Sequence, residues 1–180
     1  LAPFFTYHFY TGEPGDSIAF AITASVIAFL LSTMLEFAVA IAGKWLIVGR
    51  LKAGRYPLWG VTYYRWWLSD RLIEAAPTYL LNGSSMYVWW FRALGAKVGR
   101  DVIIGSMTLR VPDLLTLGDG VSIGNAANFE NARVEHGELR LGPITLGREA
   151  SVGSYAVLEG NTQIGAYGHL EGQSALSDGK

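Results

Sequence analysis

A six-residue repeat of aliphatic side chains in the last third of the chain restricts its fold more than any other feature. The repeat consists of Leu146, Val152, Leu158, Ile164, Leu170 and Leu176. Four residues after each of the first five come small residues, namely Ala150, Ala156, Thr162, Gly168 and Ser174. A period of six fits neither an α-helix nor a two-sided strand. It predicts a chain that turns a corner every six residues, three hexapeptides to a triangular turn, so Val152 should lie against Leu170, 18 residues later.

The repeat predicts an all-β left-handed parallel β-helix, a known exception to the right-handed connection between parallel strands. The same spacing of an aliphatic residue and a glycine occurs earlier, at Val98-Gly99, Ile104-Gly105, Leu117-Gly118 and Ile123-Gly124. We therefore expect this hexapeptide-repeat domain to occupy residues 94–180, with its largest loop excursion at residues 125–143. Solenoid ends need a cap, and none is evident before Lys180, so we expect the sequence to be a piece of a longer polypeptide.

A separate feature is a long apolar segment near the N-terminus. Residues 17–42 contain a single charged side chain, Glu36. As an α-helix this segment would be about 39 Å long, enough to cross a bilayer. A cleaved signal peptide is shorter and follows basic residues, whereas Glu13 and Asp16 precede this segment. We expect membrane-spanning structure within residues 1–55, with the main span at about residues 17–42.

The flanks of this segment predict its orientation. Six basic residues follow it: Lys44, Arg50, Lys52, Arg55, Arg65 and Arg71. The positive-inside rule places such a flank, and the domain after it, in the cytoplasm. Residues 1–10 are aromatic and apolar and resemble the outer end of a preceding span, with residues 12–15 as an external turn. Glu36 is either a functional carboxylate or the partner of a group on another helix, and the sequence leaves both open.

Two aromatic clusters lie between the span and the repeat, within residues 56–93. The first contains Trp59, Tyr63, Tyr64, Trp66 and Trp67 beside Arg65, and the second contains Tyr87, Trp89, Trp90 and Phe91 beside Arg92. Aromatic rings mixed with arginine are typical of the headgroup layer of a membrane. We expect short interfacial helices that contact membrane lipid. Nucleic acid is not an expected partner, because a net charge of −1 gives no broad basic surface.

Few residues in the repeat domain could carry chemistry. The chain has no cysteine, which excludes a thiolate nucleophile, a disulfide and a cysteine metal site. The candidate catalytic residues lie in the excursion and are Glu130, Glu135 and His136, because a histidine beside a carboxylate can take a proton from an attacking amine. The alternative is that His136 is an exposed residue of a Glu-His-Gly turn. No metal site is expected, since the domain has only His136 and His169, at a spacing that matches no metal motif.

Three stretches of the chain together resemble one known family. They read GKWLIVGRLKAGRYPLWGVTYYRWW (residues 43–67), FRALGAKVGRDVIIGS (residues 91–106) and PDLLTLGDGVSIGNAANFENARVEHGELRLGPITLGREASVGSYAVLEGNTQIG (residues 112–165). The chain resembles the carboxy-terminal region of the ε-poly-L-lysine synthetase family, whose members are membrane-bound non-ribosomal peptide synthetases. In that family an adenylation domain and a carrier domain precede six membrane helices, which surround three related soluble domains.

This resemblance implies one membrane segment and one soluble domain of an enzyme that joins lysine, or another cationic amino acid, through amide or isopeptide bonds. It implies the bacterial cytoplasmic membrane as location, with a carrier-domain thioester and an amino-acid or polymer acceptor as partners. Sister domains of the same polypeptide would complete a pseudo-trimer. No cofactor is expected within these residues, whereas ATP and phosphopantetheine would serve domains outside them.

Two alternatives to this function remain. One is a membrane-anchored hexapeptide acyltransferase with a CoA donor, and the other is a non-catalytic scaffold or polymer-binding domain. The second alternative gains weight from the excursion itself. Some copies in the family carry a histidine in the loop after the second glycine pair, where this chain reads Asn125-Ala-Ala-Asn128.

Overall fold

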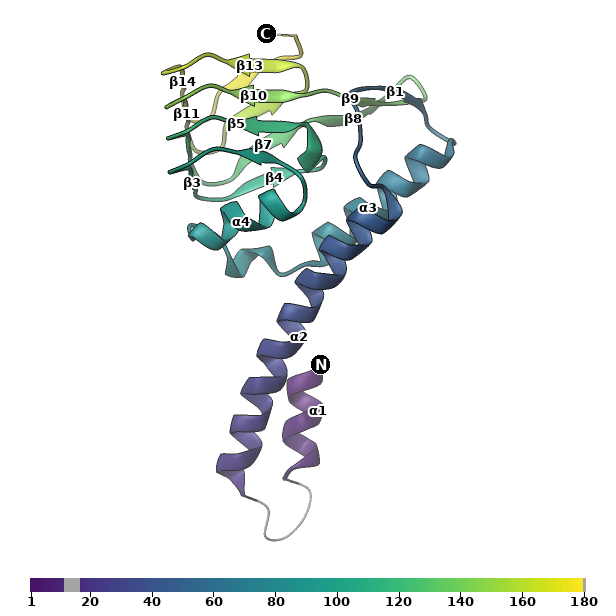
Figure 1. Ribbon diagram of the computed structural model, residues 1–180, viewed down its shortest axis with the longest axis vertical. Coiled ribbons are helices and arrows are strands. Elements are labelled where there is room, and N and C mark those ends of the chain that lie inside the picture. The colour runs from purple at the N-terminus through teal and green to yellow at the C-terminus, as the bar shows by residue number, and fades with distance from the viewer. Residues whose placement is uncertain (12–16, 180) are drawn as a thin grey trace.

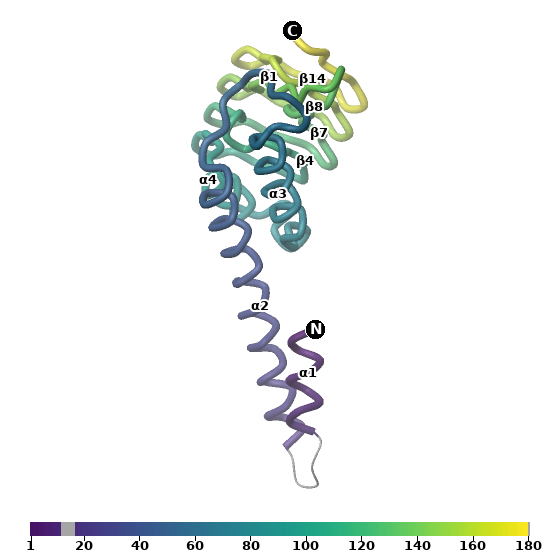
Figure 2. The backbone as a smooth tube through the Cα atoms, turned by 90° about the vertical axis from the view of Figure 1, so that its right-hand side faces the viewer, coloured from purple at the N-terminus to yellow at the C-terminus, as the bar shows by residue number. Residues whose placement is uncertain are grey.

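The computed structural model describes residues 1–11 and 17–179, and it consists of a helical stalk that leads into a domain built on β-sheets (Figure 1). The expected turn at residues 12–15 and the acidic flank, Glu13 and Asp16, lie outside the described residues, as does Lys180. Figure 2 shows the same arrangement from the side, with the first helix folded back along the lower part of the second.

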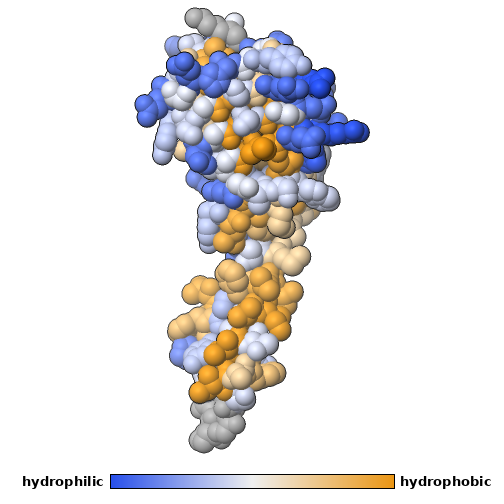
Figure 3. Space-filling view, turned by 90° about the vertical axis from the view of Figure 1, so that its left-hand side faces the viewer, coloured by the Kyte–Doolittle hydropathy of each residue, from blue (hydrophilic) through white to orange (hydrophobic). Residues whose placement is uncertain are grey.

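The stalk is an exposed apolar helix, α2 (Ile18–Ile47), with the short α1 (Ala2–Phe9) beside it. The Ser17 side chain caps α2 by accepting a hydrogen bond from the backbone N–H of Phe20. The mean hydropathy of its most apolar 18-residue window is 2.3, and only 6% of that window is buried. A core helix of a soluble protein would be mostly buried, whereas hydrophobic side chains cover much of this stalk (Figure 3). By length and composition α2 can cross a membrane, as the sequence predicts.

Three parallel four-stranded sheets form the body of the domain, and the chain visits them in rotation. The first sheet contains β2 (Lys97–Val98), β5 (Leu115–Leu117), β10 (Ile144–Leu146) and β13 (Thr162–Ile164). The second contains β3 (Ile103–Ile104), β6 (Ser122–Ile123), β11 (Ser151–Val152) and β14 (His169–Leu170). The third contains β4 (Met107–Leu109), β7 (Ala127–Glu130), β12 (Val157–Glu159) and β15 (Ala175–Leu176).

The six-residue repeat sets the register of these sheets. Val152 of β11 pairs with Leu170 of β14, as the spacing of 18 residues predicts. Leu158 of β12 is fully buried and has Phe129 and Leu176 as its partners on the neighbouring strands. Each aliphatic residue of the repeat therefore stacks on its equivalent in the next strand of the same sheet.

The predicted fold class, a membrane helix plus an all-β left-handed parallel β-helix, is wrong for the soluble part. An α/β domain follows the apolar helix instead, because α3 (Val61–Ala75) and α4 (Ser85–Ala93) pack with the sheets. Four residues on one face of α4 join the same core as Ile104 and Leu115, namely Tyr87, Val88, Trp90 and Phe91. The sequence predicts an interfacial helix here because aromatic residues beside arginine are typical of a membrane interface. In the structure these aromatic side chains face the core of the domain instead.

A small antiparallel sheet projects from the domain. It has the order β1-β9-β8 and consists of β1 (Gly54–Pro57), β8 (Ala132–Glu135) and β9 (Glu138–Leu141). Tyr56 lies opposite Leu139, and Trp66 of α3 packs on Leu139 in a second, smaller core. Residues 125–143 are therefore not one loop, since β7 belongs to the third parallel sheet and only the β8–β9 hairpin leaves it.

A buried ion pair fastens the stalk helix to this domain. Lys44 of α2 donates a hydrogen bond to Asp113 Oδ1 at 2.7 Å, with side-chain exposures of 3% and 5%. The second oxygen of Asp113 accepts from the backbone N–H of Leu51 at 3.1 Å. Gly95 leaves room for this pair, because a Cβ atom there would lie 2.5 Å from Asp113 Oδ1. The indole of Trp45 adds a hydrogen bond to the carbonyl of Ala93 at 2.8 Å.

Removing one partner of this ion pair should destabilise the attachment strongly. Asp113→Ala leaves the Lys44 ammonium buried and unpaired, and we expect it to lower the free energy of unfolding by about 3–5 kcal/mol. Combining it with Lys44→Met should restore much of that loss, since no buried charge then remains. Urea-dependent proteolysis in detergent would measure both.

The exposed pair of Arg148 and Glu149 offers a control of the same type. Glu149→Ala should change the free energy of unfolding by less than about 1 kcal/mol, because both charges are solvated. A loss for Asp113→Ala as small as that for Glu149→Ala would contradict the structural role of the buried pair.

The core position of Leu158 gives a second test. Leu158→Asp buries a carboxylate without a partner and should cost about 3 kcal/mol or more in stability. Gln163→Asp is the control, because Gln163 is an exposed residue of β13, the next strand along the chain. Thermal unfolding of both variants would show a large loss for the first only; equal melting temperatures would mean that the register is wrong.

Candidate functional site

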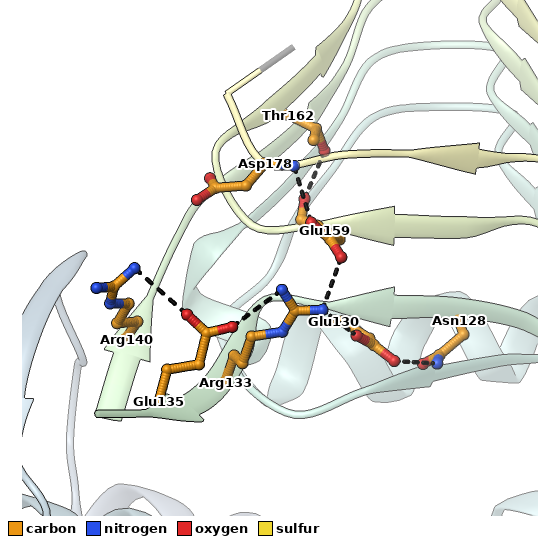
Figure 4. Close-up of polar contacts among 8 residues, drawn as sticks. All are labelled: Asn128, Glu130, Arg133, Glu135, Arg140, Glu159, Thr162 and Asp178. Carbon is orange, nitrogen blue, oxygen red and sulfur yellow. Dashed lines mark hydrogen bonds and ion pairs between the residues drawn. The ribbon is translucent and has the colours of Figure 1, made fainter. Parts of the chain in front are cut away.

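A carboxylate-rich cleft lies where the β8–β9 hairpin leaves the third sheet (Figure 4). Its volume is about 50 Å³. Ten residues line it: Glu130, Asn131, Arg133, Glu135, Arg140, Gly142, Glu159, Gly160, Asn161 and Asp178. Four carboxylates against two guanidinium groups leave an excess of two negative charges. Two of the three predicted site residues, Glu130 and Glu135, are part of it.

The parallel register brings two glutamates side by side in this cleft. Glu130 of β7 lies directly opposite Glu159 of β12. Like charges in that position repel each other. Arg133 offsets the repulsion, since its Nη2 lies 2.7 Å from Glu159 Oε1 and 3.6 Å from Glu130 Oε2. Its Nη1 lies 3.2 Å from Glu135 Oε1, so one guanidinium contacts three carboxylates.

This arginine remains charged under all ordinary conditions. The hydrogen bond from Arg133 to Glu159 raises the pKa of the guanidinium above its usual value, and the charges of Glu135 and Glu130 add to the effect. About 44% of its side chain is exposed, so water screens these pairs. Arg133 therefore organises the carboxylates without consuming all of their negative charge.

The remaining groups of the cleft fix the carboxylates from their other sides. Asn128 donates to Glu130 Oε1 at 2.9 Å, and the backbone N–H of Asp178 donates to Glu159 Oε2 at 2.9 Å. Arg140 Nη1 lies 3.4 Å from Glu135 Oε2. The Nε of Arg140 is buried and has no hydrogen-bond partner among the described residues.

Glu159 and Asp178 belong to this site although the sequence analysis did not select them. Glu159 directly follows Leu158, at a position where Gly147, Gly153 and Gly165 follow other residues of the repeat. That exchange of glycine for a carboxylate is the signal that could have identified Glu159. Asp178 lies beyond the last strand and gives no comparable signal.

The chain matches a curated protein over almost its whole length. It is 50% identical over 176 residues to delta-poly-L-ornithine synthetase of Acinetobacter baumannii (strain AB307-0294). These residues are 98% of this chain and 13% of that protein, so the chain spans only a small part of its relative. No family model matches the sequence. The similarity supports a relationship to the synthetases of poly-amino acids, and the relative's name specifies ornithine rather than lysine.

His136 stands apart from the carboxylates of the cleft. It occupies the exposed turn between β8 and β9, with a left-handed backbone (φ 50°). Within residues 1–11 and 17–179, no hydrogen bond or ion pair involves its side chain. His169, the other histidine of the domain, pairs with Ser151, whose Oγ lies 2.6 Å from His169 Nδ1 on the exposed face of the second sheet. Among the described residues no group of three or more His, Asp or Glu has a geometry that could hold a metal ion.

A larger cavity of about 250 Å³ lies between α3, α4 and β4. Its charged residues are Asp70, Arg71, Glu74 and Arg110, so its charges balance. Asp70 Oδ2 lies 2.7 Å from Arg71 Nη2 and 3.7 Å from Arg110 Nη1. These groups pair with each other and join α3 to the third sheet. The excess of carboxylates therefore distinguishes the smaller cleft as the candidate site for a cation.

Proposed function

We propose that this chain is a segment of a membrane-bound synthetase that joins a cationic amino acid, such as ornithine or lysine, through amide bonds. The identity of 50% over 176 residues to a poly-ornithine synthetase supports this proposal. An amide-forming enzyme of this kind activates its monomer with ATP and presents it as a thioester on a phosphopantetheine carrier. Both steps belong to parts of the polypeptide outside these residues, and we expect sister domains to pack beside this one in a pseudo-trimer.

Within that enzyme, we propose that the cleft binds the ammonium groups of the acceptor or of the growing polymer. The observation that carries this role is the excess of carboxylates around Arg133. A polymer of diamino acids bears one ammonium group per unit, and a carboxylate-lined surface attracts it electrostatically.

The geometry favours binding over proton transfer by this domain. The amine that attacks a thioester must lose a proton to a base within hydrogen-bond reach. Glu130, Glu135 and Glu159 already contact Arg133, and His136 lies on an exposed turn without an orienting partner among the described residues. Holding the acceptor in place is the task that these residues can perform as they stand.

Affinity for a cationic oligomer tests this role. Glu135→Gln and Asp178→Asn should each weaken binding of a short ornithine oligomer to the full-length protein about two- to fivefold, since each removes one partly solvated charge. Arg133→Gln should strengthen binding, because it removes a competing cation. Fluorescence titration at low and high salt would show both effects, and high salt should diminish them.

Glu149→Gln is the matched control, since Glu149 is an exposed carboxylate outside the cleft. It changes the net charge by the same amount and should leave affinity unaltered. If Glu149→Gln weakens binding as much as Glu135→Gln does, the oligomer senses the overall charge and the cleft is not its site.

We further propose that the domain faces the cytoplasm. The six basic residues that follow the apolar segment support this orientation. Five of them are exposed, and Lys44 alone is buried in the pair with Asp113.

A thiol probe checks this orientation. The described chain contains no cysteine, and Tyr167 is an exposed residue of the domain. In intact cells, Tyr167→Cys should resist a membrane-impermeant thiol reagent and react only after permeabilisation, with the parent protein as control. Labelling from outside would reverse the assigned orientation.

A further inference from the structure

The face of the domain from which the stalk descends carries exposed hydrophobic side chains. It is formed by the 3₁₀ helix η1 (Thr78–Leu80) and by α4 (Figure 1). Four large hydrophobic side chains on these elements are exposed, namely Tyr79, Leu80, Met86 and Trp89, and we call them the underside patch. Met86 and Trp89 lie one helical turn apart, on the face of α4 opposite Tyr87, Val88, Trp90 and Phe91.

This exposure is large for side chains of this type. Trp89 is 72% exposed and Met86 is 65% exposed. Apolar surface of that size is unfavourable in water. Several exposed apolar side chains on one face mark a surface that a partner molecule or a membrane covers. The other face of α4 is already used by the core, so what covers this face comes from outside the domain.

The contact between α4 and the stalk helix fixes the depth of the patch. The rings of Trp90 and Phe37 are 5.1 Å apart in an edge-on arrangement. Phe37 is the twentieth residue of α2, which begins at Ile18. Twenty helical residues extend about 30 Å, the thickness of the hydrocarbon core of a bilayer. If α2 enters the hydrocarbon core of the bilayer at Ile18, it leaves that core near Phe37, at the level where α2 contacts α4.

The other aromatic cluster lies at a different level. α3 runs back along α2, because Arg65 donates to the carbonyl of Ile47 while Leu72 lies against Gly43. Trp59 and Tyr64 therefore lie near the far end of α2. Ile47 is ten residues beyond Phe37, or about 15 Å further along the helix. The sequence predicts that both aromatic clusters lie at the membrane interface, but in the structure they are about 15 Å apart along the axis of α2.

We propose that the underside patch lies in the headgroup layer of the bilayer that α2 crosses, and that Trp59 and Tyr64 do not. The occupant of the patch is phospholipid. Tryptophan, tyrosine and long apolar side chains on a short two-faced helix are suited to this layer. The inference rests on α2 spanning a membrane, and it is independent of what the carboxylate cleft binds. The domain would then contact the membrane surface directly, in addition to its anchoring by α2, and this second contact would fix its orientation on the membrane.

Photo-cross-linking in native membranes tests this placement. Benzoylphenylalanine would replace Trp89, Met86, Leu30 or Trp59, one at a time, in the full-length protein. Leu30 is an exposed residue of α2 within the span, and Trp59 is an exposed tryptophan, 77% accessible, of the distant cluster. Mass spectrometry of the labelled peptide then identifies phospholipid adducts. Elution of each variant from a sizing column in detergent shows that it is folded.

The expected result is a lipid adduct at position 89 within about threefold of that at position 30, and at least about tenfold more than at position 59. Position 86 gives the same answer if the tryptophan variant does not fold. Adducts at position 30 without adducts at 86 or 89, or protein adducts at 89, would overturn the proposal. Equal lipid adducts at 59 and 89 would also overturn it. Absence of adducts at position 30 would show instead that α2 does not span, whatever the cleft binds.

Discussion

The ion pair between Lys44 and Asp113 determines how the two parts of this chain meet. Burying two charges is costly, and an apolar pair of the same size would hold the helix as well. The pair, however, has one geometry: a 2.7 Å hydrogen bond to one oxygen of Asp113, with the other oxygen held by the backbone of Leu51. The stalk helix therefore joins the domain at one rotation and one height. The contact of Phe37 with Trp90 follows from this.

Strand spacing is the part of this fold that the sequence could predict. The hexapeptide repeat placed Val152 against Leu170, because stacking identical turns of chain demands equal spacing. The fold class of the domain could not be predicted from the hexapeptide repeat. Whether Trp90 and Phe91 face lipid or core depends on apolar surface supplied by strands such as β3, and no local pattern encodes that surface. Lys44 and Asp113 are 69 residues apart and gave no signal for the same reason.

The site was predictable to the extent that it is local. Glu135 lies in the β8–β9 hairpin, which departs from the repeat, and Glu130 lies at the end of β7, the strand just before that hairpin. Glu159 joins them only through the parallel register, which places it opposite Glu130. Arg133 is then required, because two glutamates at that spacing repel each other unless a cation lies between them. A pattern read along the chain identifies Glu130 and Glu135, but it identifies neither Glu159 nor the arginine that joins the three carboxylates.

The two surfaces for which we propose functions, the carboxylate cleft and the underside patch, lie at different heights of the domain. α4 contacts the first strands, β2 and β3, whereas Glu159 lies on β12, two strands beyond β4 in the third sheet. At about 4.8 Å per strand, the cleft stands roughly 10 Å above the layer of β4. A polycation close to an anionic membrane is attracted to its headgroups, and that attraction falls off over about one Debye length. If the cleft binds the polymer as we propose, its distance from the membrane would weaken the competition from the headgroups for the same ammonium groups. If α2 crosses the bilayer as we propose, Glu36, one residue before Phe37, would also lie at the height of the headgroups, where a carboxylate can stay hydrated without a partner helix.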